Sequence, residues 1–304
     1  MSQTPSQAIE IVEVGARDGL QNEAAILSVE DRVDFINRLE ACGVKRIEAV
    51  SFVNPRRVPQ MAGAEEIMAA LPARDSVSRI GLVLNERGWE RCVAAGCDEA
   101  NVVVCASDGF GIRNQGASVA EQVATMARIA ERQAAEGGPR LSLTVSVAFG
   151  DPFDGEVSEA QVAAIAAEAA RAGIGEIALG DTIGVADPWT VRRRIEAVRK
   201  VAPEARIRMH FHNTRNTGFA NVYASIEAGC HVIDASTGGI GGCPFAPDAT
   251  GNIATEDLVY MLERGGVETG LDLGKLIETA RWVGGKLGKD APSALTRAGV
   301  FPAA

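Results

Sequence analysis

The sequence predicts an α/β fold, a (β/α)8 or TIM barrel with one extra C-terminal helix. Short runs rich in β-branched residues alternate with longer, alanine-rich amphipathic runs along the whole chain, which indicates parallel strands joined by helices. A corner in which glycine follows alanine within two residues recurs just before a strand, at 41–44, 95–97, 172–174 and 228–230. Repeated helix-to-strand corners of this kind favour a closed barrel.

An open doubly wound sheet is the alternative architecture. The first strand is not followed by Gly-x-Gly-x-x-Gly, so the dinucleotide-binding version of that fold lacks its fingerprint. Polar and reactive residues follow several different strands, as in a barrel whose site lies at the carboxyl ends of the strands. Both observations favour closure.

Eight strands and eight helices are expected in alternation. The strands are predicted at 9–14, 45–50, 79–84, 101–105, 141–148, 176–179, 206–211 and 231–234. The helices are predicted at 28–42, 64–71, 86–95, 120–135, 158–171, 188–201, 217–228 and 255–264, with the extra helix at 273–287. Ser158 and Thr255 precede acidic first turns, and glycines follow several last turns, as helix ends require. We expect one domain over 1–304, with a barrel core at about 9–265 and a helical extension at about 266–304.

Composition narrows the class of protein. The net charge of -10 argues against a nucleic-acid partner, because no basic face is available to meet a phosphate backbone. No apolar stretch reaches the roughly 20 residues that a membrane span needs, and the first eight residues do not resemble a signal peptide. Six cysteines form no Cys-x-x-Cys pair, which fits a reduced compartment. We therefore expect a cytoplasmic protein without a membrane partner. The sequence does not fix the oligomeric state and is compatible with a homo-oligomer.

The strongest local signal is the pair His210 and His212, two of only three histidines in the chain. Residues two apart on a strand point to the same face, which in a barrel is the interior. Two imidazoles on one face can chelate a metal ion. A hydrogen-bonded pair of core histidines is the alternative.

Two further side chains can complete a metal site. Asp18 follows the first strand and Asn252 follows the last, so both belong to the same rim of a barrel. Each also fits an ordinary turn residue. Two nitrogens and two oxygens suit Mg²⁺, Mn²⁺ or Zn²⁺, and a site with positions open for substrate oxygens favours Mg²⁺ or Mn²⁺.

Three charged residues on this rim are candidates for chemistry. Arg17 adjoins Asp18 and can stabilise a developing oxyanion. Glu48 is a carboxylate inside an apolar strand, so it is expected to pair with Arg17 or with the surroundings of the metal. Asp181 ends the sixth strand, where a catalytic role and a turn-forming role are about equally supported.

A glycine-rich loop carries a cysteine. Residues 238–242 hold four glycines, and Cys243 follows them outside any apolar run. A mobile loop bearing a thiol over a barrel mouth suggests a lid that brings a proton donor or acceptor. A plain flexible loop with an incidental cysteine is the alternative, and a phosphate cradle is less favoured because no Gly-Lys-Ser/Thr follows.

Together these motifs resemble those of the 3-hydroxy-3-methylglutaryl-CoA lyase family. The matching blocks run in family order from about residue 9 to 265. They are Arg-Asp-Gly-Leu-Gln-Asn-Glu at 17–23, Ser-Phe-Val-x-Pro at 51–55, Val-Pro-Gln-Met at 58–61, Gly-Asp-Thr-Ile-Gly at 180–184, His-Phe-His at 210–212, Gly-Gly-Cys-Pro at 241–244 and Gly-Asn-x-Ala-Thr-Glu-Asp at 251–257. The Gly-Gly-Cys-Pro loop separates the lyases from related barrel synthases and aldolases that share the metal site.

The resemblance implies a role for each candidate residue. The metal would be held by Asp18, His210, His212 and Asn252. Arg17 would stabilise the enolate of the departing acetyl-CoA, Glu48 would hold Arg17, Cys243 would be the loop thiol and Asp181 would lie near the reacting hydroxyl, with His210 also among the catalytic residues. The implied reaction is a metal-dependent retro-Claisen cleavage of a CoA-thioester substrate to acetoacetate and acetyl-CoA.

Three rim segments depart from the family pattern and put the preferred acyl group in question. Asn-Thr-Arg-Asn at 213–216 stands where the family usually has Asp-Thr-Tyr-Gly, and Gly-Asp-Pro-Phe-Asp-Gly at 150–155 replaces Gly-Cys-Pro-Tyr-Glu-Gly. The stretch 107–114 keeps a basic residue before asparagine but not the usual flanks. Citramalyl-CoA or a longer-branched 3-hydroxyglutaryl-CoA are therefore alternative substrates. Arg56, Arg57 and Arg113 are candidates for the CoA phosphates, with a solvated surface charge equally supported for each.

Other classes of protein fit less well. A metal-dependent hydrolase or Fe(II) oxygenase with two histidines and a carboxylate would leave Cys243 without a role. A non-catalytic barrel is disfavoured because every proposed ligand is present together with Arg17 and Cys243. A Claisen-condensing synthase commonly carries a further C-terminal domain, which this chain is too short to hold.

Overall fold

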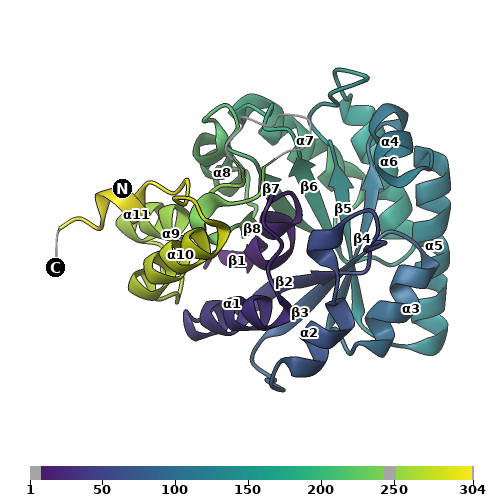
Figure 1. Cartoon of the computed structure of the whole chain (residues 1–304). Coiled ribbons are helices and arrows are strands. Elements are labelled where there is room, and N and C mark those ends of the chain that lie inside the picture. Colours follow the sequence, from purple (N-terminus) through teal and green to yellow (C-terminus); the bar gives the residue numbers. More distant parts are fainter. Residues whose placement is uncertain (1–7, 243–250, 303–304) are drawn as a thin grey trace.

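Eight parallel strands, paired in chain order, close into a barrel. The computed structural model describes residues 8–242 and 251–302. The strands are β1 Glu10–Glu13, β2 Arg46–Ser51, β3 Ser78–Val83, β4 Glu99–Cys105, β5 Arg140–Ser146, β6 Glu176–Asp181, β7 Arg206–Phe211 and β8 Val232–Ala235. The last strand pairs with the first, so the predicted closure is confirmed (Figure 1).

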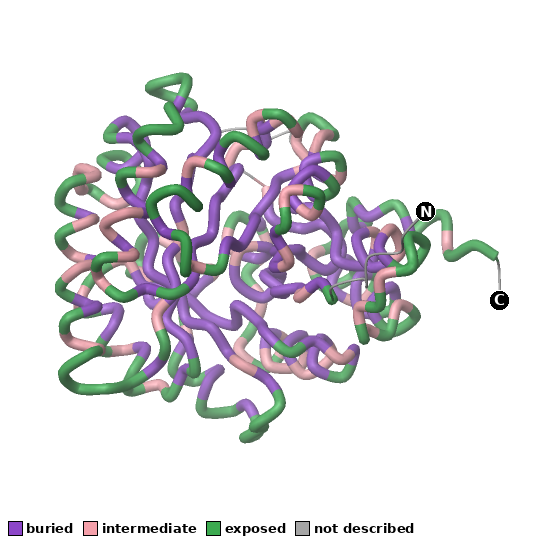
Figure 2. Tube along the Cα trace, turned by 180° about the vertical axis from the view of Figure 1, so that it is seen from behind, coloured by how far each residue is buried: buried purple, intermediate pink, exposed green. Residues whose placement is uncertain are grey.

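Helices follow the strands around the outside of the barrel (Figure 1). They are α1 Val29–Ala41, α2 Ala64–Ala70, α3 Glu86–Ala94, α4 Asp108–Gln115, α5 Val119–Glu136, α6 Glu159–Arg171, α7 Pro188–Val201, α8 Gly218–Glu227, α9 Thr255–Arg264, α10 Leu273–Leu287 and α11 Leu295–Ala298. Short irregular helices lie at η1 Gly15–Gly19, η2 Pro59–Met61 and η3 Thr237–Gly239. Figure 2 shows buried segments concentrated in the interior and exposed segments on the outer surface. Among the described helices, none is both long and apolar enough to cross a membrane.

The expected extra helix is present at its predicted bounds as α10. It packs against α1, where the rings of Phe35 and Trp282 lie 5.9 Å apart and Lys286 pairs with Asp31. Helix α10 therefore covers the outside of the barrel beside the first βα unit.

The fifth strand is shorter than predicted. It ends at Ser146 rather than at residue 148, because the next residue, Val147, has a φ of 50°. This left-handed conformation is strained for a β-branched residue and turns the chain at the rim of the barrel. The backbone N–H of Val147 donates to Thr182 Oγ1 at 2.9 Å, which ties the rim of β5 to that of β6.

Helix α4 was not predicted. Its sequence contains Gly109 and Gly111, which lower helix propensity. The helix starts against the β5–α6 loop, where Asp151 accepts the N–H of Phe110 and Asp154 accepts the N–H of Gly109. Carboxylates at a helix N-terminus stabilise it, so contacts from another part of the chain outweigh the weak local preference.

The interior of the barrel is charged at the amino ends of the strands. Arg46 lies at the centre, 2.6 Å from Glu10 and 2.8 Å from both Glu99 and Glu176. Arg208 extends this network one level up, 3.3 Å from Glu176. Because each buried charge has a partner of opposite sign, the network is tolerated in the core. The catalytic candidates lie above it, at the carboxyl ends.

Candidate metal centre and active site

The turn after β1 presents Arg17 and Asp18 together. Residues Gly15–Gly19 form a π-helical turn, a rare geometry that often marks functional sites. Gly19 has no room for a side chain, since a Cβ there would lie 2.7 Å from Ser236 Oγ. The turn is thus held tightly against the end of β8.

Asp18, His210 and His212 converge on one point. Asp18 Oδ2 lies 3.8 Å from His210 Nε2 and 3.7 Å from His212 Nε2. One ligand atom from each of the three side chains falls within 4.8 Å of the others. These separations exceed a hydrogen bond, but two ligands each about 2.1 Å from one ion lie about 3.0–4.2 Å apart. The donor set of two imidazole nitrogens and a carboxylate oxygen therefore fits a divalent cation.

Asn252 joins the same cluster. Its Nδ2 donates to Asp18 Oδ2 at 2.8 Å and to the backbone oxygen of Ile240 at 3.2 Å. The residue is buried and pairs through its backbone with His212. A 180° rotation of the amide group would exchange its nitrogen and oxygen, so that the carbonyl oxygen faced Asp18 and could serve as a metal ligand. All four predicted ligands are thus brought together.

Arg17 lies between two carboxylates. Its Nε donates to Glu48 Oε2 at 2.6 Å, its Nη2 lies 2.5 Å from the same oxygen, and its Nη1 donates to Asp18 Oδ1 at 2.8 Å. The other oxygen of Glu48 accepts from Asn101 at 3.1 Å. Burial would lower the pKa of Arg17, but the charges of Glu48 and Asp18 raise it. Arg17 is therefore a fixed cation beside the proposed metal.

The surroundings of Asp18 favour its ionised form. Burial opposes its charge, but Arg17 and the two histidines hold the pKa of its carboxyl well below the ordinary value. An ionised carboxylate is the form that binds a cation.

His210 has a partner on its other ring nitrogen. Its Nδ1 lies 3.2 Å from Asp234 Oδ2, and the two residues are register partners on β7 and β8. Burial lowers the pKa of His210, whereas the hydrogen bond with Asp234 and the charge of Asp18 raise it. The second effect is larger, so the pKa of His210 lies above its ordinary value.

Asp181 is fully buried at the end of β6. Its two oxygens accept the backbone N–H groups of Val185 and Ala186 at 2.8 and 3.1 Å. Burial raises the pKa of its carboxyl, although these N–H groups and the two histidines act against the increase. Asp181 therefore stabilises the turn after β6, and its carboxyl group also interacts electrostatically with the two histidines of the cluster.

Two buried glutamate side chains hold the base of the glycine-rich loop. Glu13 accepts the N–H and hydroxyl of Thr237 at 2.9 and 2.7 Å, and Glu256 accepts the N–H of Gly238 at 3.0 Å. Gly241 passes so close to the metal cluster that a Cβ would lie 2.5 Å from Asn252 Nδ2. The loop base is therefore anchored directly beside the proposed ligands.

Cys243 lies outside the described residues, so its predicted role stays a prediction. Its neighbour Gly242 is described, and the backbone oxygen of Gly242 accepts from Asn22 Nδ2 at 2.8 Å. Gly242 therefore lies on the same rim as Asp18.

The arginines proposed for CoA follow β2 and β4 and are exposed. Arg113 donates to the backbone oxygen of Gly109 at 2.9 Å and stacks over Phe153 at 4.1 Å from the ring centre. Arg56 and Arg57 lie in the loop after β2. All three belong to segments that follow the carboxyl ends of strands, and their contact with CoA stays a prediction.

The departures from the family pattern have structural roles. Asn213 Oδ1 accepts the N–H of Gly218 at the start of α8, and Arg215 donates to the backbone oxygens of Ile183 and Gly184 at 2.9 Å. Asp151 is buried and accepts from Ser107, Phe110 and Phe153. These residues shape the rim beside the site.

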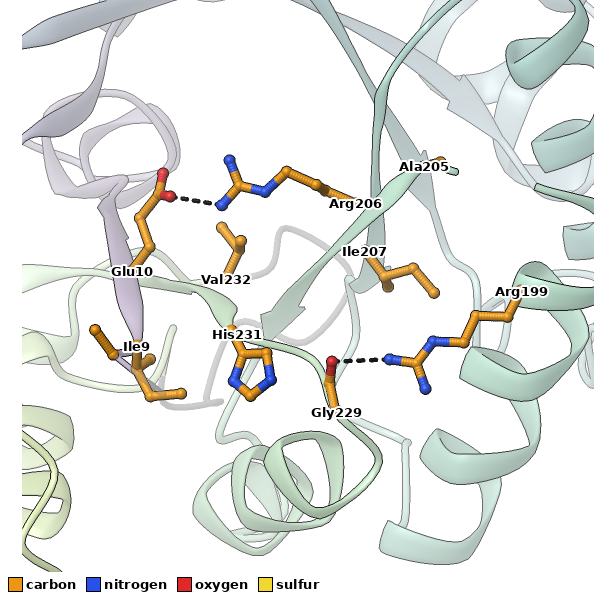
Figure 3. A pocket seen from close by; sticks show the side chains of 10 residues that line it. Ile9, Glu10, Arg199, Ala205, Arg206, Ile207, Gly229, His231 and Val232 are labelled. Atoms are coloured by element: carbon orange, nitrogen blue, oxygen red, sulfur yellow. Dashed lines mark hydrogen bonds and ion pairs between the residues drawn. The ribbon is translucent and has the colours of Figure 1, made fainter. Parts of the chain in front are cut away.

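A cavity of about 500 Å³ lies at the other end of the barrel (Figure 3). It is lined by Glu10, Arg199, Arg206 and His231 among others. Arg206 pairs with Glu10 at 2.6 Å, and Arg199 donates to the backbone oxygen of Gly229 at 2.8 Å. Because its arginines are already engaged and it lies away from the strand ends that carry the cluster, we do not place the active site there.

Three strand residues that contribute to the site were missed in the sequence. Asn101 and Asp234 are polar residues inside apolar strands, the same signal that identified Glu48. Glu13 ends the first strand in the same way. A systematic search for buried polar residues in strands would have found all three.

Comparison with known proteins places the chain in a family. The HMGL-like family model matches residues 8–283. The chain is 44% identical over 307 residues to an (R)-citramalyl-CoA lyase of Chloroflexus aurantiacus, covering 97% of this chain and 96% of the relative. It is 41% identical over 282 residues to the hydroxymethylglutaryl-CoA lyase of Pseudomonas mevalonii, covering 93% of each.

A solved structure agrees over the full length. An HMG-CoA lyase from Acinetobacter baumannii, in complex with coenzyme A and 3-methylmalate, has a TM-score of 0.94 and 38% identity, covering 100% of this chain and 99% of that one. The resemblance indicated by the sequence motifs is confirmed, as is the assignment to an enzyme family of lyases. The chain belongs to the HMGL-like family.

Proposed function

We propose that this chain cleaves 3-hydroxy-3-methylglutaryl-CoA to acetoacetate and acetyl-CoA, using Mg²⁺ or Mn²⁺. The observation that carries the proposal is the convergence of Asp18, His210 and His212 beside the fixed guanidinium of Arg17. A bound divalent cation would supply Lewis-acid stabilisation to the substrate's hydroxyl and carboxylate oxygens. The residues that would hold it are Asp18, His210, His212 and Asn252.

Arg17 is suited to stabilise the enolate of the departing thioester. Among the described residues, Arg17 donates from Nε to Glu48 and from Nη1 to Asp18, and its Nη2 also lies 2.5 Å from Glu48. A guanidinium has five N–H groups, so donors remain for a substrate oxygen. Because Glu48 fixes the guanidinium, no reorganisation is needed as negative charge develops.

We assign Asp181 as the base that accepts the proton of the substrate's hydroxyl group. If His210 held the cation and donated from Nδ1 to Asp234, neither of its ring nitrogens would be free to accept a proton. Asp181 lies on the same rim, and burial raises the pKa of its carboxyl, which makes it a stronger base than an ordinary aspartate. His210 acts as a ligand in this scheme.

The carbon–carbon bond then breaks between the hydroxyl-bearing carbon and the CH₂ of the thioester. The hydroxyl carbon becomes the ketone of acetoacetate, and the bonding pair passes to the thioester as an enolate facing Arg17. Cys243, on the loop anchored by Glu13 and Glu256, protonates the enolate carbon to give acetyl-CoA.

Citramalyl-CoA is the second candidate substrate, and the 44% identity to a citramalyl-CoA lyase favours it. Its carboxylate is attached directly to the hydroxyl carbon, so the same cleavage would yield pyruvate and acetyl-CoA. The rim residues Asp151, Asn213 and Arg215 depart from the family pattern, and we assign the choice between the two substrates to the rim segments that they stabilise. A longer-branched 3-hydroxyglutaryl-CoA would meet the same rim.

Product analysis tests the proposal. Purified protein with Mg²⁺ is mixed separately with 3-hydroxy-3-methylglutaryl-CoA and citramalyl-CoA, and acetoacetate, pyruvate and acetyl-CoA are quantified. Acetoacetate with a higher kcat/KM for the methylglutaryl thioester is expected. A higher kcat/KM for citramalyl-CoA would make that thioester the substrate instead. If no acetyl-CoA formed from either thioester or from a longer-branched homologue, the lyase function would be overturned.

A further inference from the structure

Asp234 stands outside the proposed ligand set but touches it. The residue lies on β8, is 4% exposed, and its Oδ2 is 3.2 Å from His210 Nδ1. His210 directs its other nitrogen, Nε2, toward Asp18. The carboxylate therefore meets the side of the imidazole that faces away from the proposed metal.

The other oxygen of Asp234 faces Arg208. Asp234 Oδ1 lies 3.3 Å from Arg208 Nε, an ion pair without the alignment of a directional hydrogen bond. Arg208 is 2% exposed, and its Nη1 lies 3.3 Å from Glu176 in the charged network below. Each oxygen of Asp234 thus has a defined neighbour.

We propose that Asp234 is a positioning residue that holds His210 in the tautomer with its proton on Nδ1, so that the Nε2 lone pair faces the metal position. A hydrogen bond to one ring nitrogen of histidine fixes which nitrogen is free for a ligand bond. This inference rests on the proposed metal-dependent function.

Arg208 makes the Asp234→Asn variant informative. The cationic Nε–H of Arg208 favours the amide oxygen over the amide NH₂ as its neighbour, because two donors repel. The NH₂ of the new asparagine then faces His210 Nδ1 and donates to it. His210 would carry its proton on Nε2, where it blocks the ligand bond, while the side chain keeps nearly the same shape.

Two measurements test the inference, and the wild-type protein alone can refute it in the first. Histidine labelled with ¹⁵N gives only three ring systems in this chain, from His210, His212 and His231. In metal-free protein at high pH, well above the ordinary imidazole pKa of about 6.5, long-range ¹H–¹⁵N spectra report the tautomer of each ring. The proposal expects His210 protonated on Nδ1 in the wild type and on Nε2 in Asp234→Asn. A wild-type His210 protonated on Nε2 would overturn it.

The second measurement is Mn²⁺ affinity by titration, with Glu176→Gln as the matched control. Glu176 contacts Arg208 within the same buried network, but the described contacts of its side chain include none with His210. Asp234→Asn is expected to weaken Mn²⁺ binding about 10- to 100-fold, and Glu176→Gln to change it less than about twofold. Equal weakening in both variants would reduce Asp234 to a structural role and refute the inference. Wild-type protein that binds no Mn²⁺ would instead refute the proposed function.

Discussion

Replacing Glu48 separates the structural and catalytic roles of the Arg17 clamp. Glu48 is 2% exposed and Arg17 is 8% exposed, and the carboxylate contacts the guanidinium at 2.5 and 2.6 Å. Glu48→Ala leaves a buried cation whose remaining carboxylate partner among the described residues is Asp18. Breaking a buried pair in this way costs about 3–5 kcal/mol of the free energy of unfolding. Arg17→Ala should cost a similar amount, because the remaining described partner of the Glu48 carboxylate is then the neutral amide of Asn101.

The double variant provides the decisive comparison. Removing both side chains leaves no unpaired charge from this pair. The double variant Arg17→Ala with Glu48→Ala should therefore lose much less free energy of unfolding than the sum of the two single variants, roughly 6–10 kcal/mol. The coupling energy between the two substitutions should be about 3 kcal/mol or more. Urea unfolding curves at pH 7 measure all four proteins. A double variant as destabilised as the sum would refute the clamp.

Glu48→Gln tests the catalytic side of the same clamp. The amide keeps the shape of the side chain and one acceptor for Arg17, so most of the stability should remain. Loss of the negative charge leaves the guanidinium less firmly oriented, and kcat should fall about 10²- to 10³-fold. Unchanged kcat in a folded Glu48→Gln protein would contradict the role assigned to Arg17.

Three further predictions concern the loop and the base. Cys243→Ala should lower kcat at least about 100-fold while Mn²⁺ affinity stays unchanged, as steady-state kinetics and metal titration would show, whereas full activity would remove the thiol from the mechanism. Asp181→Asn should likewise lower kcat more than it raises KM, and a change confined to KM would count against its assignment as the base. Burial raises the pKa of Glu256 to about 8, so the stability from its neutral form is complete below the unfolded pKa of about 4.5 and is lost as pH rises through 8. Glu256→Gln should therefore gain stability relative to wild type by up to about 1.4 kcal/mol per pH unit between about pH 5 and 8 in urea unfolding, and a constant difference would contradict the buried neutral carboxyl.

The barrel and most of the cluster could be predicted because their signals are local. The two-residue spacing of His210 and His212 places both imidazoles on one face of β7, and Asp18 and Asn252 follow strands whose ends meet at one rim. Closure of the barrel brings the carboxyl ends of these strands to one rim, so the fold alone predicts that these distant residues lie close together.

The contacts that the sequence did not reveal depend on register and on packing between segments. The partnership of His210 with Asp234 follows from the pairing of β7 with β8, which the strand pattern alone does not fix. Helix α4 forms despite its glycines because Asp151 and Asp154 reach it from the next loop. The early end of β5 arises from the left-handed backbone of Val147, a conformation that a valine gives no reason to expect.

Pulsed electron paramagnetic resonance of the Mn²⁺-loaded protein tests most directly whether the three side chains bind one ion. We expect one Mn²⁺ per chain, coupled to two imidazole nitrogens, with one coupling lost in His210→Ala and the other in His212→Ala. Bound Mn²⁺ without nitrogen coupling, or couplings that persist in both variants, would contradict the site described by Asp18, His210 and His212.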